Sequence, residues 1–545
     1  MTTSPSQSPT ASGLPLVVQV AFAGKRRLFD PPHASSGDEA AFAAAVERLL
    51  VERLHRLQTE LGGGRVCGLS SLAAGGDLMF ARSCQQLGWW QRVLLPQPRE
   101  DFLAACGSGG PDFTPAEAEE ARRLLLGGHV IEERVASVAS ERATRFEDVN
   151  LELVRICDVL VCLLPGAATA DKPAGTRATL ALAQRWHRPV LEIGVTVGKD
   201  GKPVLSEQWH CPPSKTAGAC PAAPGFAPAR LPAPLDRITP PATGLDDAAA
   251  YRAALKQFSS ATATRMQRRF KWAALIIVGA HVAATALALA ALKIHGETAL
   301  HWLLGIELSF LLFGLGYHEY LHRSHAAQRW AMARLSAEVA RSAIPLAGVP
   351  RSLRYLFELP MPGELRPLLR TLNVLHLAGL SARTGTWQAR RETYVAERLR
   401  KPVNGQLDYY ARRLAQARRW LQVAQATFFV GSAGAFAATA AKLGLALDWW
   451  HVGTAAHDLA AGGLGSLAVF LPVVAVAALS LAGAFDLEAR VHTYAEMLEF
   501  LQHHTHLIEA AVSENEFATL ALQIEARLLG ETANWHARRA FTGVA

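Results

Sequence analysis

The sequence predicts an α/β doubly wound parallel sheet in the N-terminal part of the chain, followed by an all-α membrane domain with four transmembrane helices. Two patterns support this prediction. Up to about residue 195, short apolar runs alternate with stretches of helical periodicity, an order typical of parallel sheets covered by helices. Four later apolar stretches are each about as long as a bilayer is thick, and they lie at 272–292, 299–317, 421–441 and 464–485.

The first residues, 1–14, are rich in Ser, Thr and Pro and are expected to form a disordered tail. They lack the basic and apolar regions of a secretory signal. The first run long enough to span a membrane begins at Trp272. The part of the chain ahead of Trp272 is therefore expected to be made in the cytoplasm.

The seven cysteines show no C-x-x-C pairing, which is typical of reduced, cytosolic thiols. Cys211 and Cys220 flank a Pro/Ala-rich stretch, with His210 beside them. A zinc site at this place would need further ligands at suitable spacing, and the sequence offers none. No metal and no cofactor are therefore expected.

The soluble domain is expected at 15–196. Apolar runs that stop at glycine or proline indicate buried strands, and apolar stripes at helical spacing indicate the helices between them. In chain order the expected elements are a strand at 14–24, a helix at 38–61, a strand, small-residue turn and helix within 65–88, a strand at 92–95, a helix and strand within 148–164, a helix opening at Gly175-Thr176 and a strand at 190–195.

Three small-residue turns follow expected strands, at Gly24–Arg27, Ser70–Asp77 and Gly166–Arg177. In a doubly wound sheet such turns share one edge, where backbone N–H groups and helix N-termini can hold an anion. The alternative is that the glycines only permit tight turns, but three turns with four basic residues favour a phosphate-bearing ligand. The expected ligand-binding residues are Gly24, Lys25, Arg26, Arg27, Ser70, Ser71, Gly75, Gly76, Asp77, Gly166, Gly175, Thr176 and Arg177.

The order VAFAGKR, GLSSLAAGGDLMFARSCQQLGW, VLLP, NLELVRICDVLVCLLPG, GTRATLALA and RPVLEI resembles the SLOG superfamily over about residues 14–195. That superfamily includes DNA-uptake proteins, cytokinin-activating LOG enzymes and the sensor domains of bacterial defence effectors. The resemblance implies that a nucleotide-derived molecule, such as a cyclic oligonucleotide or an ADP-ribose derivative, binds at these turns.

The chain departs from the hydrolases of that superfamily at one position. LOG-type hydrolases carry P-G-G-x-G-T-x-x-E, in which the last glutamate is catalytic. Here Pro165-Gly166 is followed by an insertion and then by Gly175-Thr176, and Thr179 stands where the glutamate would be. A threonine cannot replace a carboxylate as general base. Binding without catalysis is therefore expected, with a membrane-anchored enzyme that cleaves NAD or a nucleotide as the alternative.

The net charge of +8 raises the possibility of nucleic-acid binding, but the placement of the charge favours a membrane. The basic residues lie outside the two pairs of spans, whereas the connections within the pairs hold only Lys293 and Lys442. Both termini are therefore expected on the cytoplasmic side of the membrane. The resemblance to the sensor domains of bacterial defence effectors implies that this membrane is a bacterial inner membrane. The basic residues concerned are Arg265, Arg268, Arg269, Lys271, Arg323, Arg329, Arg412, Arg413, Arg418, Arg419 and Arg490.

A unit of helix, membrane hairpin and helix occurs twice, at 248–345 and 393–545, with connecting cytoplasmic helices at 346–392. A linker is expected at 197–247, with a β-hairpin at Gly198–Gly201. Each copy resembles the SLATT domain, a two-span module found with SLOG domains in bacterial defence operons. The best-matching residues are the Y-x-x-x-R-L approach to the third span and the closing GE-x-x-x-W, and the resemblance implies a homo-oligomer.

Glu307 lies in the middle of the second span, where an ionisable side chain must face a helix interface or a wet cavity. It is interpreted either as a pore-lining carboxylate or as a neutral group that is hydrogen-bonded between helices. His281, Gln422 and Gln425 are the expected partners, or they join helices by hydrogen bonds of their own.

Together these features predict a membrane effector of a bacterial anti-phage system of the CBASS or Thoeris kind. A second messenger, made by a nucleotidyltransferase or a TIR protein, would bind the SLOG-like domain. The membrane domain would then form a pore or disrupt the inner membrane and cause abortive infection. A constitutive transporter is a third interpretation, but it leaves the ligand-binding type of soluble domain unexplained.

Overall fold

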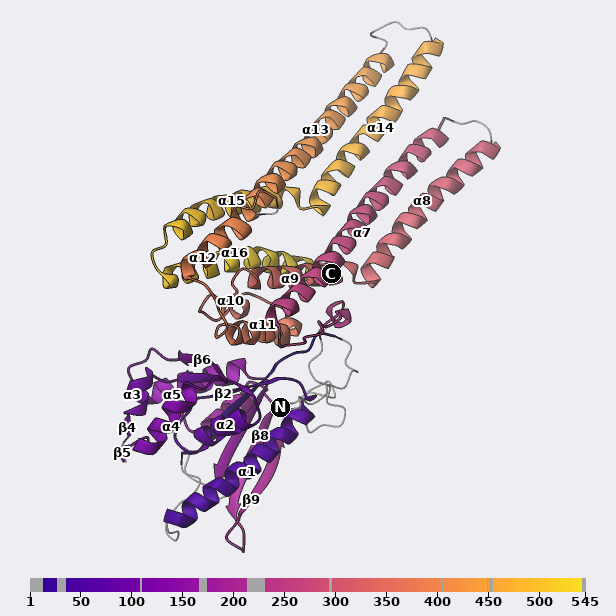
Figure 1. Cartoon of the computed structure of the whole chain (residues 1–545). Helices are drawn as coiled ribbons and strands as arrows, with labels where there is room; N and C mark the ends of the chain where they lie inside the picture. Colours follow the sequence, from indigo (N-terminus) through magenta and orange to yellow (C-terminus); the bar gives the residue numbers. More distant parts are fainter. Residues whose placement is uncertain are drawn as a thin grey trace. The chain divides into compact units, whose positions relative to one another are not determined.

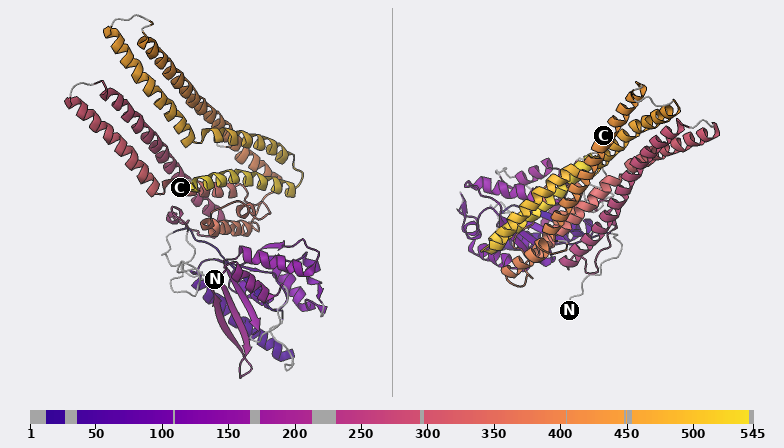
Figure 2. Two further views of the ribbon diagram at one scale, coloured as in Figure 1. Left: turned by 180° about the vertical axis from the view of Figure 1, so that it is seen from behind. Right: turned by 90° about the horizontal axis from the view of Figure 1, so that it is seen from above.

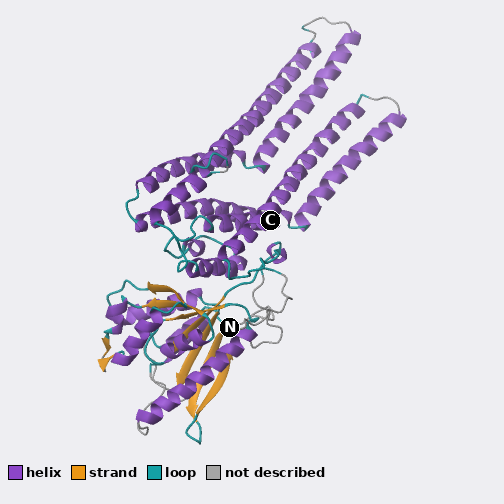
Figure 3. Cartoon of the chain, viewed as in Figure 1, coloured by secondary structure: helices purple, strands orange, loops and turns teal. Residues whose placement is uncertain are grey.

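The computed structural model describes residues 13–26, 36–107, 110–165, 174–212, 231–293, 297–403, 405–447, 449 and 454–541. The chain forms two compact units, and each is considered by itself. The first comprises Met1–Ala254 and Ala347–Thr384, and the second comprises Leu255–Leu346 and Gly385–Ala545. The strands that the structure describes belong to the first unit, and the described part of the second unit is helical (Figure 1, Figure 3).

The first unit is built on a seven-stranded sheet with the order β6-β3-β2-β1-β7-β8-β9. All neighbouring strands are parallel except β9, which runs antiparallel to β8. The chain winds outward from β1 to β6 and then returns to β7 on the other side of β1, so the predicted doubly wound sheet is confirmed. The strands are β1 (Val18–Gly24), β2 (Val66–Ser70), β3 (Trp90–Leu95), β6 (Val130–Val135), β7 (Val159–Pro165), β8 (Val190–Val197) and β9 (Pro203–His210), and a small separate pair is formed by β4 (Cys106–Gly107) and β5 (Gly110–Pro111).

Helices cover both faces of the sheet, because alternate side chains of each strand are apolar in both directions. Val20 and Phe22 of β1 join a core with α1 and α2, whereas Ala21 and Ala23 join a core with α5 and α6. The helices of this part are α1 (Ser36–Glu60), α2 (Gly76–Gln86), α3 (Arg99–Leu103), α4 (Pro115–Leu125), α5 (Arg142–Ile156) and α6 (Thr176–Arg185).

The expected linker at 197–247 is not a linker over its whole length. Gly198 N donates to Lys202 O at 2.7 Å, and this turn connects β8 to β9, so the expected hairpin is present. Residues 203–210 therefore belong to the sheet as an edge strand. The polar residues of β9 hid this strand, because an edge strand with one solvated face lacks a continuous apolar run.

The first unit also contains a segment from the far side of the first membrane hairpin. This segment holds α10 (Tyr355–Glu358) and α11 (Arg366–Ala378), which lie within the expected connecting helices. Val17 N donates to Thr371 Oγ1 at 2.9 Å, and the Arg370 guanidinium pairs with Asp158. Because Val17 and Asp158 directly precede β1 and β7, α11 contacts the amino ends of these two strands.

Four described cysteines, Cys67, Cys84, Cys157 and Cys162, are free and buried. Burial raises the pKa of the Cys67 thiol to about 12, so this thiol is protonated at neutral pH. Cys211, in contrast, is disulfide-bonded. The expectation that the cysteines are reduced thiols is therefore wrong at Cys211.

Four helices of the second unit are long and apolar enough to cross a membrane, as predicted. They form two hairpins, α7–α8 and α13–α14, whose helices lie side by side in each view (Figure 1, Figure 2). This part of the chain is therefore typical of a multi-pass membrane protein. The helices are α7 (Ala248–Ala291), α8 (Glu297–Arg323), α9 (Ala326–Ala343), α12 (Trp387–Thr393), a π-helical turn (Tyr394–Leu399), α13 (Gln406–Ala446), α14 (Thr454–Ala484), α15 (Leu487–Ala510) and α16 (Glu514–Phe541).

The helices that continue from the two hairpins pack against one another. Trp330 of α9 contacts Trp535 of α16 edge-on at 4.9 Å, and Phe270 of α7 stacks on the same Trp330 at 5.2 Å. Glu525 of α16 is fully buried, and the Arg398 guanidinium donates to its two oxygens at 2.8 and 2.6 Å. The two copies of the repeat therefore share one helical core below their hairpins.

Candidate functional site

The described residues of the three predicted turns lie at the carboxyl edge of the sheet, around the point where the strand order reverses. β1 has β2 on one side and β7 on the other, so the chain leaves the centre of the sheet in two directions from this point. Gly24 at the end of β1 is in register with Leu163 of β7. Ligands of doubly wound sheets bind in the crevice at such a reversal.

The turn after β1 and the turn before α2 are closed on each other. A Cβ atom on Gly24 would lie 2.8 Å from Gly76 Cα, and one on Gly75 would lie 2.0 Å from Arg26 O. Gly75 also has φ +82°, and Gly76 N donates to Lys25 O at 3.0 Å. These glycines permit a close approach of two backbone segments, which is the alternative explanation that the sequence left open for them.

Asp77 lies in the first turn of α2, where it is buried. Its carboxylate is 3% exposed and accepts hydrogen bonds from Gly24 N at 3.0 Å, Ser71 Oγ at 2.6 Å and Ala73 N at 3.4 Å. Burial raises the pKa of Asp77, and these hydrogen bonds act in the opposite direction. Ser70 is buried at the end of β2. The serines and Asp77 therefore hold the turn together.

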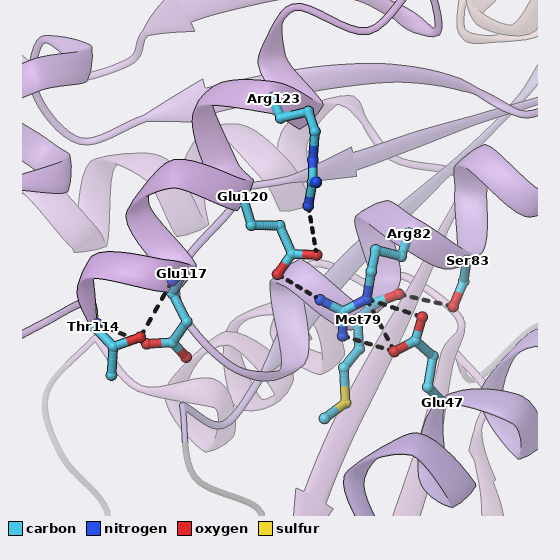
Figure 4. A network of polar contacts seen from close by, with 8 residues as sticks. All are labelled: Glu47, Met79, Arg82, Ser83, Thr114, Glu117, Glu120 and Arg123. Atoms are coloured by element: carbon cyan, nitrogen blue, oxygen red, sulfur yellow. Dashed lines mark hydrogen bonds and ion pairs between the residues drawn. The ribbon is translucent and has the colours of Figure 1, made fainter. Parts of the chain in front are cut away.

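Helix α2 itself is anchored by Arg82, which lies one turn after the buried Met79 (Figure 4). The Arg82 guanidinium bonds to Glu47 of α1 at 2.7 Å and to Glu120 of α4 at 3.0 Å. Since α2 is fixed between two neighbouring helices, its first turn has a fixed position at the edge of the sheet.

The N-terminus of α6, like that of α2, has no side-chain cap hydrogen bond, but at α2 the first N–H, of Gly76, bonds to Lys25 O. Gly175 is the N-cap residue and makes no side-chain cap hydrogen bond. The preceding Ala174 has φ +61°, and its carbonyl accepts from Asn150 Nδ2 at 2.9 Å. Thr176 is buried and Arg177 is half-buried, and within the described part of the chain Arg177 forms no ion pair. An anion could therefore be held at this helix end.

Thr179, at the position of the expected but missing glutamate, is buried within α6. Its hydroxyl donates to Gly175 O at 3.1 Å, and its side chain is 1% exposed. Two other expected ligand-binding residues, Arg27 and Gly166, lie outside the described residues.

A cluster that the sequence did not predict adds positive charge at the same edge. Arg26 and Arg142 both pair with the buried carboxylate of Asp112. Each guanidinium also lies over the Phe146 ring, at 5.6 and 5.5 Å from its centre. Two guanidinium groups therefore share one carboxylate beside an aromatic ring. The RATRF run at the start of α5 is its sequence signal, but that helix start was hidden because β6 was not predicted.

Comparisons of this chain with protein-family models and with curated proteins find no match.

The expected membrane residues do not come together within one chain. His281 Nδ1 donates to Ile277 O at 2.8 Å within α7, and a Cβ atom on Gly314 would lie 3.0 Å from its ring. Gly314 is seven residues from Glu307 along α8, about 10 Å, so His281 packs two turns away from the carboxylate. Gln422 and Gln425 are exposed on α13.

Glu307 is half-buried and forms no ion pair or hydrogen bond within the described part of the chain. Small residues of α13 pack against α14 instead, since Gly431 leaves only 3.0 Å between its would-be Cβ atom and Ala475 Cβ. Gly431 therefore permits close packing of α13 against α14.

Proposed function

We propose that this protein is a membrane effector of a bacterial anti-phage system, in which the sheet unit binds a nucleotide-derived second messenger. The observation that supports this most is the uncapped N-terminus of α6, with Arg177, at the strand-order reversal of a doubly wound sheet whose chain continues into membrane-crossing helices. The expected consequence of binding is that the hairpins form a pore or disrupt the inner membrane, which leads to abortive infection.

The charges and the aromatic ring at the carboxyl edge of the sheet favour a ligand in which a phosphate is joined to a flat, polarisable group. The α6 N-terminus offers backbone N–H groups and a positive partial charge to a phosphate. Arg26, Arg142 and Phe146 lie at the same edge and offer guanidinium groups and an aromatic ring, which suit a nucleobase or further phosphates. A cyclic oligonucleotide or an ADP-ribose derivative combines both features. Its source would be a nucleotidyltransferase or a TIR protein.

Binding without hydrolysis is the favoured activity. Thr179 is buried and hydrogen-bonded to its own helix, so it offers no general base to a ligand at this edge. Chromatography of NAD, AMP and the bound ligand after incubation with the full-length protein tests this. Turnover that disappears in Arg177→Ala would show that the protein is an enzyme and would overturn this part of the proposal.

The contacts of α11 suggest how binding reaches the membrane. β1 and β7 border the proposed ligand site at their carboxyl ends and meet Thr371 and Arg370 of α11 at their amino ends. The chain passes between the two units after Ala254, Leu346 and Thr384. A change at β1 and β7 therefore has routes through α11 as well as through the start of α7.

Binding is tested by calorimetry on the full-length protein with a panel of cyclic oligonucleotides and ADP-ribose derivatives. Arg177→Ala should weaken affinity by about 1.5–3 kcal/mol, as expected when a charge-assisted hydrogen bond to phosphate is lost. Arg185→Ala, on the exposed last turn of the same helix, is the matched control and should bind normally. Failure of the folded protein to bind any member of the panel would refute the sensor role.

A further inference from the structure

An apolar groove of about 480 Å³ runs between the two hairpins, along the membrane-spanning parts of α7, α13 and α14. On α7 its lining extends from Leu275 to Ala286, eleven residues later, which is about 16 Å of helix. The hydrocarbon core of a bilayer is roughly 30 Å thick, so the groove has the length of a single leaflet. Val474 and Leu481 of α14 line its opposite wall.

One end of this groove is cationic. Lys271 lies one helical turn before Leu275, at the end of the hairpins away from their connecting loops. Arg413 is on α13 before its apolar part, and Arg490 is in the first turn of α15, just beyond α14. The cations thus come from three helices at the side where the hairpins continue into the helical core.

The three cations influence one another. Burial, together with the charges of Arg413 and Arg490, lowers the pKa of the Lys271 ammonium group. The Arg413 guanidinium donates to the neutral Gln416 Oε1 at 3.1 Å and lies over the Tyr409 ring at 5.4 Å. Three cations at one end of the groove attract an anionic group.

We propose that this groove is a binding site for an anionic phospholipid. Lys271, Arg413 and Arg490 hold the phosphate of the headgroup, and one acyl chain lies between α7 and α14. A lipid fits better than a peptide or a second copy of the chain, because the groove is apolar, has the length of one leaflet and has three cations beyond one of its ends. The lipid would join the two hairpins, so their arrangement would depend on membrane composition.

The full-length protein in detergent is titrated with phosphatidylglycerol or phosphatidylcholine, and bound lipid is counted by native mass spectrometry. Phosphatidylglycerol should bind more tightly, and Lys271→Gln and Arg413→Gln should each weaken it about fivefold, as expected for one cation near a lipid phosphate. Lys271→Arg should retain binding. Arg418→Gln, an exposed cation further along α13, is the control.

The acyl-chain part of the proposal is tested separately with Gly279→Leu. Gly279 lines the groove, and no atom lies within 4 Å of its would-be Cβ atom, so leucine fills the groove without a clash with the helices. Gly316→Leu on α8, where the space is also open, is the control. Phosphatidylglycerol binding should fall in Gly279→Leu only.

Several outcomes would overturn the proposal. The first is equal affinity for phosphatidylglycerol and phosphatidylcholine. The second is unchanged phosphatidylglycerol binding in Gly279→Leu, and the third is displacement of phosphatidylglycerol by inorganic phosphate at an equal concentration. The fourth is a changed oligomeric mass in Gly279→Leu. The last result would assign the groove to a second copy of the chain.

Discussion

Two helix N-termini at the same sheet edge differ through single residues. At α2 the protein supplies its own carboxylate, Asp77, and Gly76 N bonds to Lys25 O. The N-cap is a glycine at both helices, Gly75 at α2 and Gly175 at α6, but the first turn of α6 contains no carboxylate. The turn before α2 is therefore closed by contacts of the protein itself, whereas the start of α6 is the place that we propose for the ligand.

Asp77→Ala should lower the free energy of unfolding by about 2–3 kcal/mol, because Gly24 N and the Ser71 hydroxyl lose a buried acceptor. Chemical unfolding of the full-length protein in detergent measures the loss. Glu119→Ala, at an exposed position of α4, should have little effect. Unchanged stability in Asp77→Ala together with lost ligand binding would instead make Asp77 a ligand contact.

His376 of α11 should make the first unit sensitive to acid. Its Nε2–H donates to Val349 O at 3.1 Å and Arg351 O at 2.9 Å, and burial, aided by the charge of Arg252, lowers its pKa from 6.5 to about 4. Between pH 6.5 and about pH 4, His376 takes up a proton in the unfolded chain but not in the folded chain. Stability is therefore lost as pH falls from 6.5 to about 4, by roughly 3 kcal/mol at most.

The measurement is the midpoint of thermal unfolding of the full-length protein at pH 7.5 and pH 5. His376→Gln can donate to the same carbonyls but does not titrate, so the difference between the two midpoints should shrink. His55→Gln, on the exposed side of α1, should leave that difference as it is. An equal pH response in His376→Gln and the unsubstituted protein would contradict this prediction.

At the scale of elements, the local pattern of apolar residues predicted the strands and helices whose burial depends on their own composition. The apolar runs of β1 and β7 and the four long apolar helices were found, because their burial follows directly from their composition. β6 was missed because its inward charge is satisfied by a distant partner, with Glu132 bonded to Arg92 of β3 at 2.6 Å. The place of α11 was missed because its contact with Val17 joins residues 354 positions apart.

The ligand site itself stays a prediction. The described residues of its turns, which glycine and small-residue spacing indicated, lie at one edge of the sheet. Spacing could not show that Asp77 points inward, nor that Asp112 brings Arg26 and Arg142 together, because these contacts depend on how separate loops fold back. The separation of two residues along the sequence does not indicate whether such side chains are in contact.

If α11 transmits the ligand signal, Arg370→Gln and Thr371→Val should separate binding from response. Ligand affinity should change by less than about twofold, since α11 contacts the opposite ends of the strands, whereas ligand-induced dye release from proteoliposomes should fall several-fold. Arg366→Gln, exposed in the first turn of α11, is the control. Normal dye release in both variants would exclude this route.

At the scale of the whole molecule, two hairpins share one helical core, and each contributes one side of the groove that contains Gly279 and Val474. Glu307 has no partner within the described part of a single chain. A pore would therefore require several chains whose second spans face one another, as expected of a homo-oligomer.

Glu307→Gln tests the pore interpretation, because it keeps the shape of the side chain and removes its charge. Ligand binding should be intact, and the preference for cations over anions should decrease several-fold in reversal-potential measurements across planar bilayers. Unchanged selectivity would assign Glu307 to a helix interface. Ligand-independent leakage by the unsubstituted protein would refute the sensor–effector proposal as a whole.

The sheet unit is discontinuous in sequence, because Ala347–Thr384 completes it from beyond the first hairpin. A truncated protein ending near residue 196 would lack β9 and α11 and would leave the backbone N–H of Val17 without Thr371. Gene fusion cannot exchange this unit for another by a single crossover, since both of its pieces would have to change together. Its evolution is thereby tied to that of the hairpin inserted within it.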